Sequence, residues 1–185
     1  SYALTAADVA NFGIVTNVAT ATGTYGPPAA PLTVTDDSTV SAGPPDPTDG
    51  LTLIKTVSPE VIRRGVPATY VIRLINDNPF PAGPLDIVDT LPLGLVYVDG
   101  SALQDGAPFP GVIVDGQVVT FPDIVAPPNT EIVFTLSARL LTGANPGEYV
   151  NTVLALDPPF GVVAGPATAT LRLLPEAVFD CADVV

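Results

Sequence analysis

The sequence predicts an all-β protein, an immunoglobulin-like β-sandwich with extra N-terminal strands from a preceding repeat. Two observations support this fold class. Short runs rich in Val, Ile, Thr, Leu, Phe and Tyr alternate with Pro, Gly and Asp turns roughly every ten residues, as in antiparallel sandwiches. In addition, 22 of the 185 residues are proline, which breaks helix interiors.

The apolar runs place the strands in order along the chain. We expect strands at 14–24, 31–40, 50–58, 66–76, 84–90, 94–99, 111–114, 117–122, 130–141, 147–156 and 162–174. The dipeptide Asp115–Gly116 between two such runs is typical of a two-residue hairpin turn. This spacing of short strands and tight turns favours a sandwich over a helical or mixed fold.

The chain divides at a stretch rich in Pro, Gly and Asp, residues 42–50, which we interpret as a linker. Residues 51–174 then form one complete immunoglobulin-like repeat. Residues 13–21 align with 147–155, with Gly, Asn and Ala coinciding at a constant offset of 134. We therefore interpret 1–41 as the terminal strands of a preceding repeat or a strand-exchange segment, and 175–185 as the start of a next module or a tail.

A pair of strands without the rest of its sandwich exposes apolar edges and faces. Residues 1–41 are therefore expected to pair with the adjacent domain or, by strand addition, with another chain. A flexible remnant is the alternative, and the sequence does not distinguish pairing within the chain from pairing between chains.

Composition excludes several kinds of chemistry. The chain has no His, no Met, no Trp and a single Cys, Cys181. Zinc sites built on His or several Cys, Ser-His-Asp and Cys-His catalysis, and a disulfide within the chain are therefore excluded. We expect no cofactor and no enzyme acting on a separate substrate.

The charge balance bears on partners. A net charge of −13 disfavours nucleic acid, which requires a basic surface. There is no apolar run of about 20 residues, so we expect no membrane span in this chain. Acidic residues flank the linker, where carboxylates can bind Ca²⁺ weakly, although a solvated acidic turn is the better explanation. These residues are Asp36, Asp37, Asp46 and Asp49.

One lysine interrupts an apolar strand face. Lys55 is the only lysine, and it alternates with Leu51, Leu53 and Val57, so it is expected to point inward. Asp89 and Asn151 interrupt two other apolar faces in the same way. The first and last strands of a sandwich commonly run side by side, so these three residues are expected to meet in the core.

Such a trio has a specific chemistry. Burial lowers the lysine pKa and gives a neutral nucleophilic amine, while it raises the aspartate pKa and keeps the carboxyl protonated. The protonated Asp89 polarises the Asn151 side chain, Lys55 attacks it, and a Lys–Asn isopeptide bond forms in a single turnover. Two alternatives stay open: a buried Lys55–Asp89 ion pair with Asn151 as a hydrogen-bond partner, or a Lys55 that extends to solvent.

Other acids are weaker candidates for the role given to Asp89. Glu131 and Glu148 compete because some isopeptide domains use glutamate, but Glu148 lies on the strand face opposite Asn151. Asp86 lies on the face opposite Asp89.

The same residues carry a family resemblance. The segments Leu53–Pro59, Ala68–Ile72, Ile87–Val98 and Tyr149–Val153, with an Asp-Thr-Leu-Pro-x-Gly core, resemble the bacterial and archaeal surface-repeat family known as domain of unknown function eleven. The resemblance covers 51–174. It implies tandem immunoglobulin-like modules in secreted or wall-associated proteins, and a trio similar to that of isopeptide-bonded adhesin and pilin domains.

Carried over residue by residue, the resemblance implies Lys55 as nucleophile, Asp89 as catalytic acid and Asn151 as acceptor. Asn17 matches Asn151 in the N-terminal segment, so a link from Lys55 to the Asn17 of a neighbour is a second possibility.

The predicted function is a structural repeat of an extracellular, cell-surface protein, a stalk or filament subunit. Its partners would be neighbouring repeats or identical subunits, with possible strand complementation through residues 1–41. An adhesin-type module that binds a surface glycan or protein is the alternative, and it predicts an exposed aromatic groove.

Overall fold

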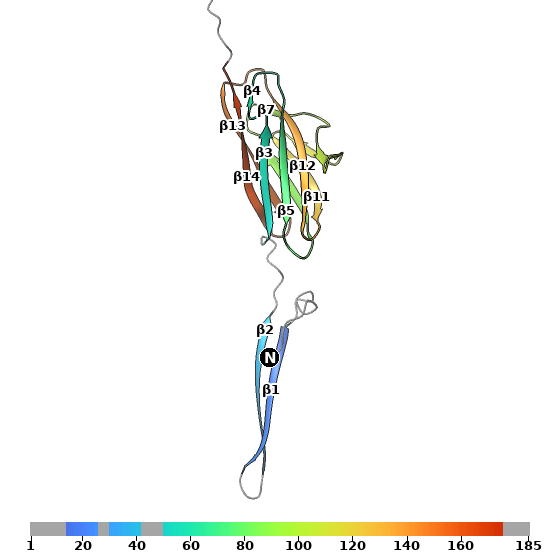
Figure 1. Ribbon diagram of the computed structural model, residues 1–185, viewed down its shortest axis with the longest axis vertical. Coiled ribbons are helices and arrows are strands. Elements are labelled where there is room, and N and C mark those ends of the chain that lie inside the picture. The colour runs from blue at the N-terminus through green and yellow to red at the C-terminus, as the bar shows by residue number, and fades with distance from the viewer. Residues whose placement is uncertain (1–13, 26–29, 42–49, 176–185) are drawn as a thin grey trace, which may run out of the picture. The chain divides into compact units, whose positions relative to one another are not determined.

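The computed structural model describes residues 14–25, 30–41 and 50–175, which fall into two compact units, 1–46 and 47–185. The first unit contains β1 (Ile14–Tyr25) and β2 (Ala30–Ser41), which form a two-stranded antiparallel sheet (Figure 1). Their pairing is continuous, from Ile14 opposite Ser41 to Tyr25 opposite Ala30. Both strands were predicted to within one residue at each end.

The second unit is built from two sheets. The strands of the first are β3 (Leu51–Ser58), β5 (Ala68–Asn76), β12 (Thr130–Leu140), β8 (Leu103–Gln104) and β9 (Ala107–Pro108), with β7 (Leu95–Tyr97) also on β12. Those of the second are β10 (Ile113–Asp115), β11 (Val118–Ala126), β6 (Ala82–Thr90), β13 (Gly147–Asp157), β14 (Gly161–Leu173) and β4 (Val61–Ile62). Both lists give the strands in their order across the sheet.

The strand order is that of an immunoglobulin-like sandwich. In such domains the first, second, fifth and fourth strands share one sheet, and the third, sixth and seventh share the other. Here β3, β5 and β12 lie together with β8, and β6, β13 and β14 lie together in the second sheet. The short β4 runs parallel to β14, whereas all other pairs are antiparallel. The predicted fold class is therefore confirmed.

Period-two alternation builds the core between the sheets. On β3 every second residue from Leu51 to Val57 is buried, and on β5 the same holds from Ala68 to Asn76. The rings of Phe121 and Phe134 meet across the core with their centroids 4.9 Å apart. Burying a large apolar side chain contributes about 1.5–3 kcal/mol, so these inward faces hold the two sheets together.

Some local details differ from the sequence-based prediction. The strands β4, β8 and β9 were not predicted, because two residues are too few to show a period. The turn after β10 is one residue later than predicted: Asp115 pairs with Val118, which leaves Gly116 and Gln117 as the loop. Gly116 has a φ of 57°, the positive value that the first loop position of a tight hairpin requires.

Strand β11 continues past its predicted end at residue 122. The pairing with β6 shifts between Phe121 and Ile124, and Asp123 in this bulge has a φ of 57°. A bulge absorbs an extra residue and allows pairing to resume, so the Pro-Asp pair that signals a strand end does not end this one.

Several predictions lie outside the described residues. The predicted linker at 42–50 lies outside them except for Gly50, and the predicted tail at 175–185 lies outside them except for Pro175. Residues 1–13 lie outside them as well, as do Asp46 and Asp49 of the suggested Ca²⁺ site. Among the described residues, no helix is long and apolar enough to cross a membrane.

Candidate functional site: a buried Lys–Asp–Asn cluster

The three residues singled out by the sequence all lie in the core of the sandwich. Lys55 is 6% exposed, and Asp89 and Asn151 are fully buried. They come from β3, β6 and β13, and only one other polar residue, Asn76, is buried among the described residues.

The sheet register explains why they approach one another. Asp89 of β6 is directly opposite Val153 of β13, which places Asn151 diagonally across from Asp89 on the same inward face. Lys55 projects from β3 in the facing sheet, and β3 packs against both β13 and β14. Strands far apart in the sequence therefore bring an amine, a carboxyl and an amide into one place.

Lys55 and Asp89 are in direct contact. The Lys55 Nζ donates a hydrogen bond to Asp89 Oδ2, and both side chains are completely shielded from solvent. This geometry excludes the alternative in which the lysine extends to solvent. An isolated charge in such a site is very unfavourable, so the two groups must either pair as ions or exchange a proton and become neutral.

Burial dominates the protonation of both groups. Removal from water lowers the pKa of Lys55 despite the opposing attraction of Asp89. Removal from water likewise raises the pKa of Asp89, against the opposing effects of Lys55 and, more weakly, the Asn151 side chain. Both shifts favour the neutral amine and the neutral carboxyl, which are the forms that an isopeptide reaction needs.

Asn151 has unused hydrogen-bonding capacity. Neither its Oδ1 nor its Nδ2 has a hydrogen-bond partner among the described residues, and the same is true of Asp89 Oδ1. The Asn151 side chain is near enough to Asp89 to influence its pKa, yet its geometry falls short of a hydrogen bond. Buried polar atoms are nearly always satisfied, so orphan atoms on two adjacent side chains are unusual.

Tyr70 is a fourth member of the cluster that the sequence analysis did not identify. Its ring lies beneath Lys55, with Nζ 5.0 Å from the ring centroid, and its buried hydroxyl has no hydrogen-bond partner among the described residues. Burial, and then the negative charge of Asp89, raise the pKa of the phenol, so it remains a proton donor. The signal was available, because Tyr70 interrupts the inward apolar face of β5 just as Lys55 interrupts that of β3.

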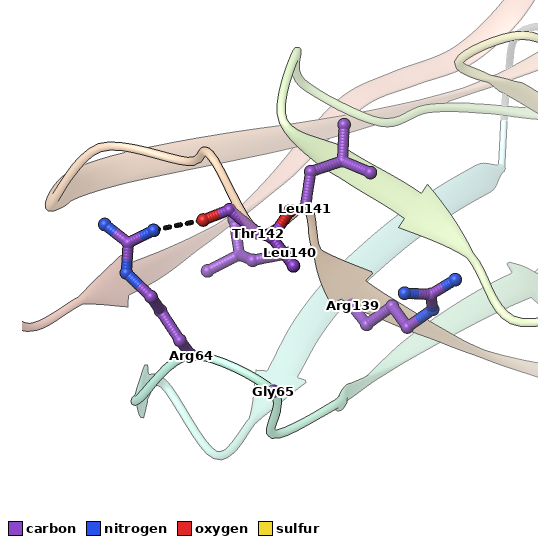
Figure 2. A pocket seen from close by; sticks show the side chains of 6 residues that line it. All are labelled: Arg64, Gly65, Arg139, Leu140, Leu141 and Thr142. Carbon is purple, nitrogen blue, oxygen red and sulfur yellow. Dashed lines mark hydrogen bonds between the residues drawn. The ribbon is translucent and has the colours of Figure 1, made fainter.

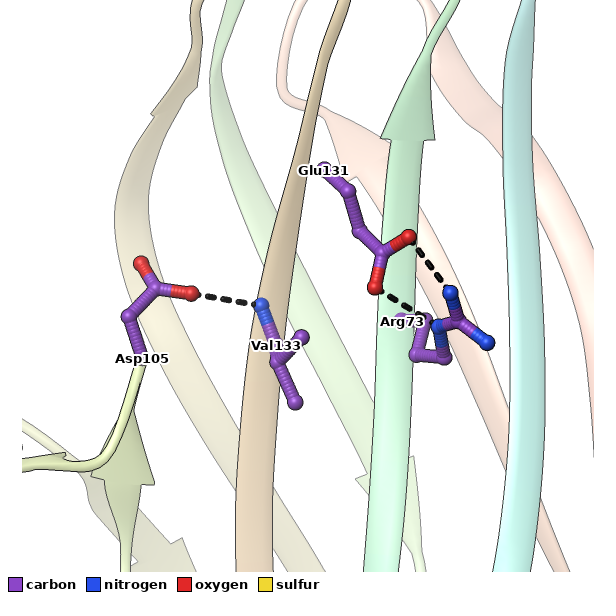
Figure 3. Close-up of polar contacts among 4 residues, drawn as sticks. All are labelled: Arg73, Asp105, Glu131 and Val133. Atoms are coloured by element: carbon purple, nitrogen blue, oxygen red, sulfur yellow. Dashed lines mark hydrogen bonds and ion pairs between the residues drawn. The ribbon is translucent and has the colours of Figure 1, made fainter.

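The competing acids do not reach this cluster. Glu131 is on the outer face of β12, where its carboxylate makes two hydrogen bonds of 2.7 and 2.6 Å to Arg73 (Figure 3). Glu148 is exposed, and Asp86 is half-buried with its Oδ1 3.3 Å from the amide of Asp123. Asp105, also in Figure 3, accepts a hydrogen bond from the Val133 amide and braces the β8–β9 hairpin. Asp89 is therefore the one acid beside Lys55 among the described residues.

Surface hollows in the sandwich give little support to a glycan-binding groove. One of about 620 Å³ is lined by Arg64, Gly65 and residues 139–142, and none of these described residues is aromatic (Figure 2). A second, of about 370 Å³, includes Tyr97 and Phe109, but the Tyr97 hydroxyl accepts a hydrogen bond from the Ala102 amide. Both of these rings pack against the core, so they serve the fold. No group of three potential metal ligands gathers among the described residues.

A scan of protein-family models finds no match, and a search of curated proteins finds no similar sequence. Among solved structures, the collagen adhesin CNA from S. aureus is similar with a TM-score of 0.46 and 12% identity, over 80% of this chain and 56% of that one. The bacterial hydrophobin BslA has a TM-score of 0.46 and 14% identity, over 70% of this chain and 97% of that one.

The pilus backbone protein RrgB from Streptococcus pneumoniae is similar with a TM-score of 0.44 and 14% identity, over 57% of this chain and 30% of that one. Similarity at this level concerns the arrangement of strands. The resemblance to the surface-repeat family therefore stays a prediction from the sequence.

Proposed function

We propose that this chain is a structural module of an extracellular surface assembly, and that its sandwich is cross-linked by an isopeptide bond between Lys55 and Asn151. One observation carries the proposal: a buried lysine contacts a buried aspartate beside a buried asparagine whose amide atoms are unsatisfied. A static ion pair accounts for the first two residues but leaves the asparagine unexplained.

The proposed reaction begins from the neutral pair. The Asp89 carboxyl donates a hydrogen bond to Asn151 Oδ1 and makes the amide carbon more electrophilic. The neutral Lys55 Nζ attacks that carbon and forms the new C–N bond. Asp89 takes a proton from the attacking nitrogen and passes one to Asn151 Nδ2, the old C–N bond breaks, and ammonia leaves. The carboxyl is regenerated, and no oxidant or cofactor is required.

Positioning supplies much of the rate. The three side chains are held by strands of two packed sheets, so no translational freedom is lost when they react. Tyr70 is a positioning residue in this scheme, because its un-ionised hydroxyl lies near Asp89 and can orient the carboxyl. The reaction happens once per chain, so it is self-processing and not turnover of a separate substrate.

A covalent link between β3 and β13 suits a load-bearing module. These strands come early and late in the sandwich, so the bond closes a loop of roughly a hundred residues and contributes about 4 kcal/mol by chain-entropy arguments. The link also suits a chain that has one cysteine and hence no internal disulfide. We place the module at the cell surface, in a stalk or filament in which 1–41 pairs with a neighbouring repeat or subunit.

The test is the intact mass of the denatured chain. We expect a mass lower than the sequence value by one ammonia, and the full sequence mass in Lys55→Ala, Asp89→Ala and Asn151→Ala. Glu131→Gln is the matched control, because it removes an acid outside the cluster and should keep the ammonia loss. Tyr70→Phe should slow the reaction without preventing it.

Two other outcomes have clear meanings. A ladder of covalent multimers on a denaturing gel would indicate a bond between subunits, with Asn17 as the first candidate acceptor. An unshifted monomer would overturn the cross-link and leave a buried ion pair in an ordinary sandwich. A binding module is the second candidate function, and it has weaker support because the aromatic rings at the hollows described above pack against the core.

A further inference from the structure

We propose that the part of the sandwich beyond Asn151, residues 152–173, is an extensible segment that leaves the sandwich under load while residues 55–151 stay locked. This inference rests on the proposed cross-link and adds how the linked module responds to a pull. It follows from where the bond lies in the chain and from how the last strand is held.

Load follows a defined path through the linked module. The sequence continues on both sides of the sandwich, so a pull along the chain enters at β3 and leaves at β14. In β3 the pull reaches Lys55, crosses the bond to Asn151 and continues through the rest of β13 into β14. Every strand from β4 to β12 lies between the two bonded residues in the sequence. That closed loop therefore carries no tension along its backbone and is not extended.

Beyond Asn151 only noncovalent contacts hold the chain to the sandwich. The extensible segment contains the end of β13, the turn and the whole of β14. Along one edge β14 pairs with β13, from Leu173 opposite Gly147 to Gly161 opposite Asp157. Its other edge pairs only with the two-residue β4 among the described strands (Figure 1). Most of β14 is therefore hydrogen-bonded on one side only.

The packing of β14 is also weaker than that of β12, which is bonded on both sides in the facing sheet. Each strand buries apolar residues in the core, but those of β14 include Ala164 and Ala169, whereas those of β12 include Ile132 and Phe134. Because the free energy of burial scales with apolar area, removal of β14 costs less than removal of β12. The contact between the rings of Phe134 and Phe121 does not involve β14, so it is retained when β14 leaves.

Resistance to the pull begins at the end of β14. The Arg172 amide donates a hydrogen bond to the Glu60 carbonyl, and the Leu174 amide donates one to the Ile62 carbonyl. Glu60 and Ile62 belong to the locked loop, and β4 runs parallel to β14. A pull along β14 therefore loads these bonds and the β13–β14 ladder together, in shear, so a definite force is needed before the strand leaves.

Once β14 has left, the rest of the segment opens in order. The pull then acts on β13 from its turn end, and its pairs with β6 break one at a time, from Leu156 back to Thr152. Opening stops at Asn151, because the next connection in the path is covalent. The 22 residues from 152 to 173 supply at most about 80 Å of chain. The module therefore lengthens by a fixed step, and β14 can re-form on the neighbouring β13 when the load is removed.

The test is single-molecule stretching of the full chain held at its two ends. In the natural chain we expect a step that frees at most about 80 Å of chain. In Asn151→Ala, which cannot form the bond, all 123 residues from 51 to 173 are freed, at most about 440 Å. The step should therefore be roughly fivefold longer in the variant.

Two insertions locate the extensible segment. Ten Gly or Ser residues added between Pro159 and Phe160, in the β13–β14 turn, should lengthen the natural step by about 35 Å. The same insertion after Gly106, in the exposed β8–β9 turn of the locked loop, is the matched control and should leave the step unchanged. In Asn151→Ala both insertions should lengthen the step equally, because the whole sandwich then unfolds.

A pair of substitutions tests what holds the segment. Leu171→Ala truncates a fully buried side chain of β14 and should lower the force at which the natural step occurs, without changing its length. Thr170→Ala, beside it on the exposed outer face, is the control and should change neither the force nor the length.

A linked chain, identified by its ammonia loss, overturns the inference if it shows no step or if its step grows with the insertion at Gly106 and not with that at Pro159. An unchanged force in Leu171→Ala overturns it as well. A natural chain that keeps its ammonia and frees about 440 Å would instead overturn the cross-link. Intact mass measured on the same sample therefore separates failure of the extensible segment from failure of the proposed function.

Discussion

The sandwich buries two asparagines completely, and their side chains differ in hydrogen bonding. Asn76 donates from Nδ2 to the carbonyl oxygens of Phe80, Ala126 and Pro127 at 3.0–3.1 Å. Its Oδ1 accepts a hydrogen bond from the Asn78 amide at 3.0 Å. The Asn151 side chain makes no hydrogen bond with any described residue.

Under the proposed cross-link, the difference separates a structural polar residue from a reactive one. Asn76 connects the β5–β6 turn to the end of β11, and its amide group is fully used in hydrogen bonds that hold the fold. Asn151 occupies an inward position where any apolar residue would pack at lower cost, since an unsatisfied buried polar group costs about 1–3 kcal/mol. The stability of the unreacted fold does not account for its placement beside Lys55 and Asp89, whereas the proposed cross-link does.

Asp89→Ala should have the largest effect. It removes the acid needed for the cross-link, whose loss costs about 4 kcal/mol. It also leaves the buried Lys55 amine without its partner, which costs about a further 1–3 kcal/mol. The free energy of unfolding from urea denaturation should fall by about the sum of these two amounts. Asp86→Ala, three residues earlier on the half-buried face, is the control and should change it little. Similar losses in both variants would contradict the special position of Asp89.

Exchanging each asparagine for alanine sharpens the comparison itself. Asn151→Ala should restore the full sequence mass and lower the free energy of unfolding by about 4 kcal/mol, because the loop is no longer closed. Asn76→Ala should keep the ammonia loss and cost about 1–3 kcal/mol through the backbone groups it leaves unpaired. An equal loss of cross-linking in both variants would mean that reactivity follows general stability and not local position.

The smallest expected effect is the pH dependence of the stability that the exposed Arg73–Glu131 pair contributes. Arg73 holds the pKa of Glu131 below its usual value of 4.5, so the pair stabilises the fold above that pH and loses this effect as the pH falls through the lowered pKa. Glu131→Gln should therefore show a slightly lower unfolding midpoint than the natural chain at pH 7 and no difference in strong acid. A difference that grows toward low pH would contradict this assignment.

When the cross-link is blocked, buried Asp89 should make the stability of the fold depend on pH in the opposite direction to Glu131. The pKa of Asp89 is raised above 3.8, so in Asn151→Ala its contribution to stability is complete below pH 3.8 and declines as the pH rises through the folded value. The contrast with Glu131 has one cause. Glu131 keeps its contact with water, whereas desolvation outweighs the lysine partner at Asp89.

Strand positions and inward polar residues were predictable because period-two alternation is a local property of the sequence. It placed Lys55, Asp89 and Asn151 on inward faces, and all three are buried. Tyr70 was missed, although it breaks the pattern of β5 in the same way, because an aromatic ring passes as an apolar residue. The bulge in β11 was also missed, because Pro122 and Asp123 locally resemble a strand end.

By itself the sequence determined the fold class, the strand faces and the chemistry that its missing residue types exclude. The tertiary structure alone decided that Lys55 contacts Asp89, and that the side chain of Asn76 is satisfied while that of Asn151 is not. The physical reason is that alternation fixes which face a side chain takes. Register and sheet packing, which depend on strands distant in sequence, fix which side chains meet.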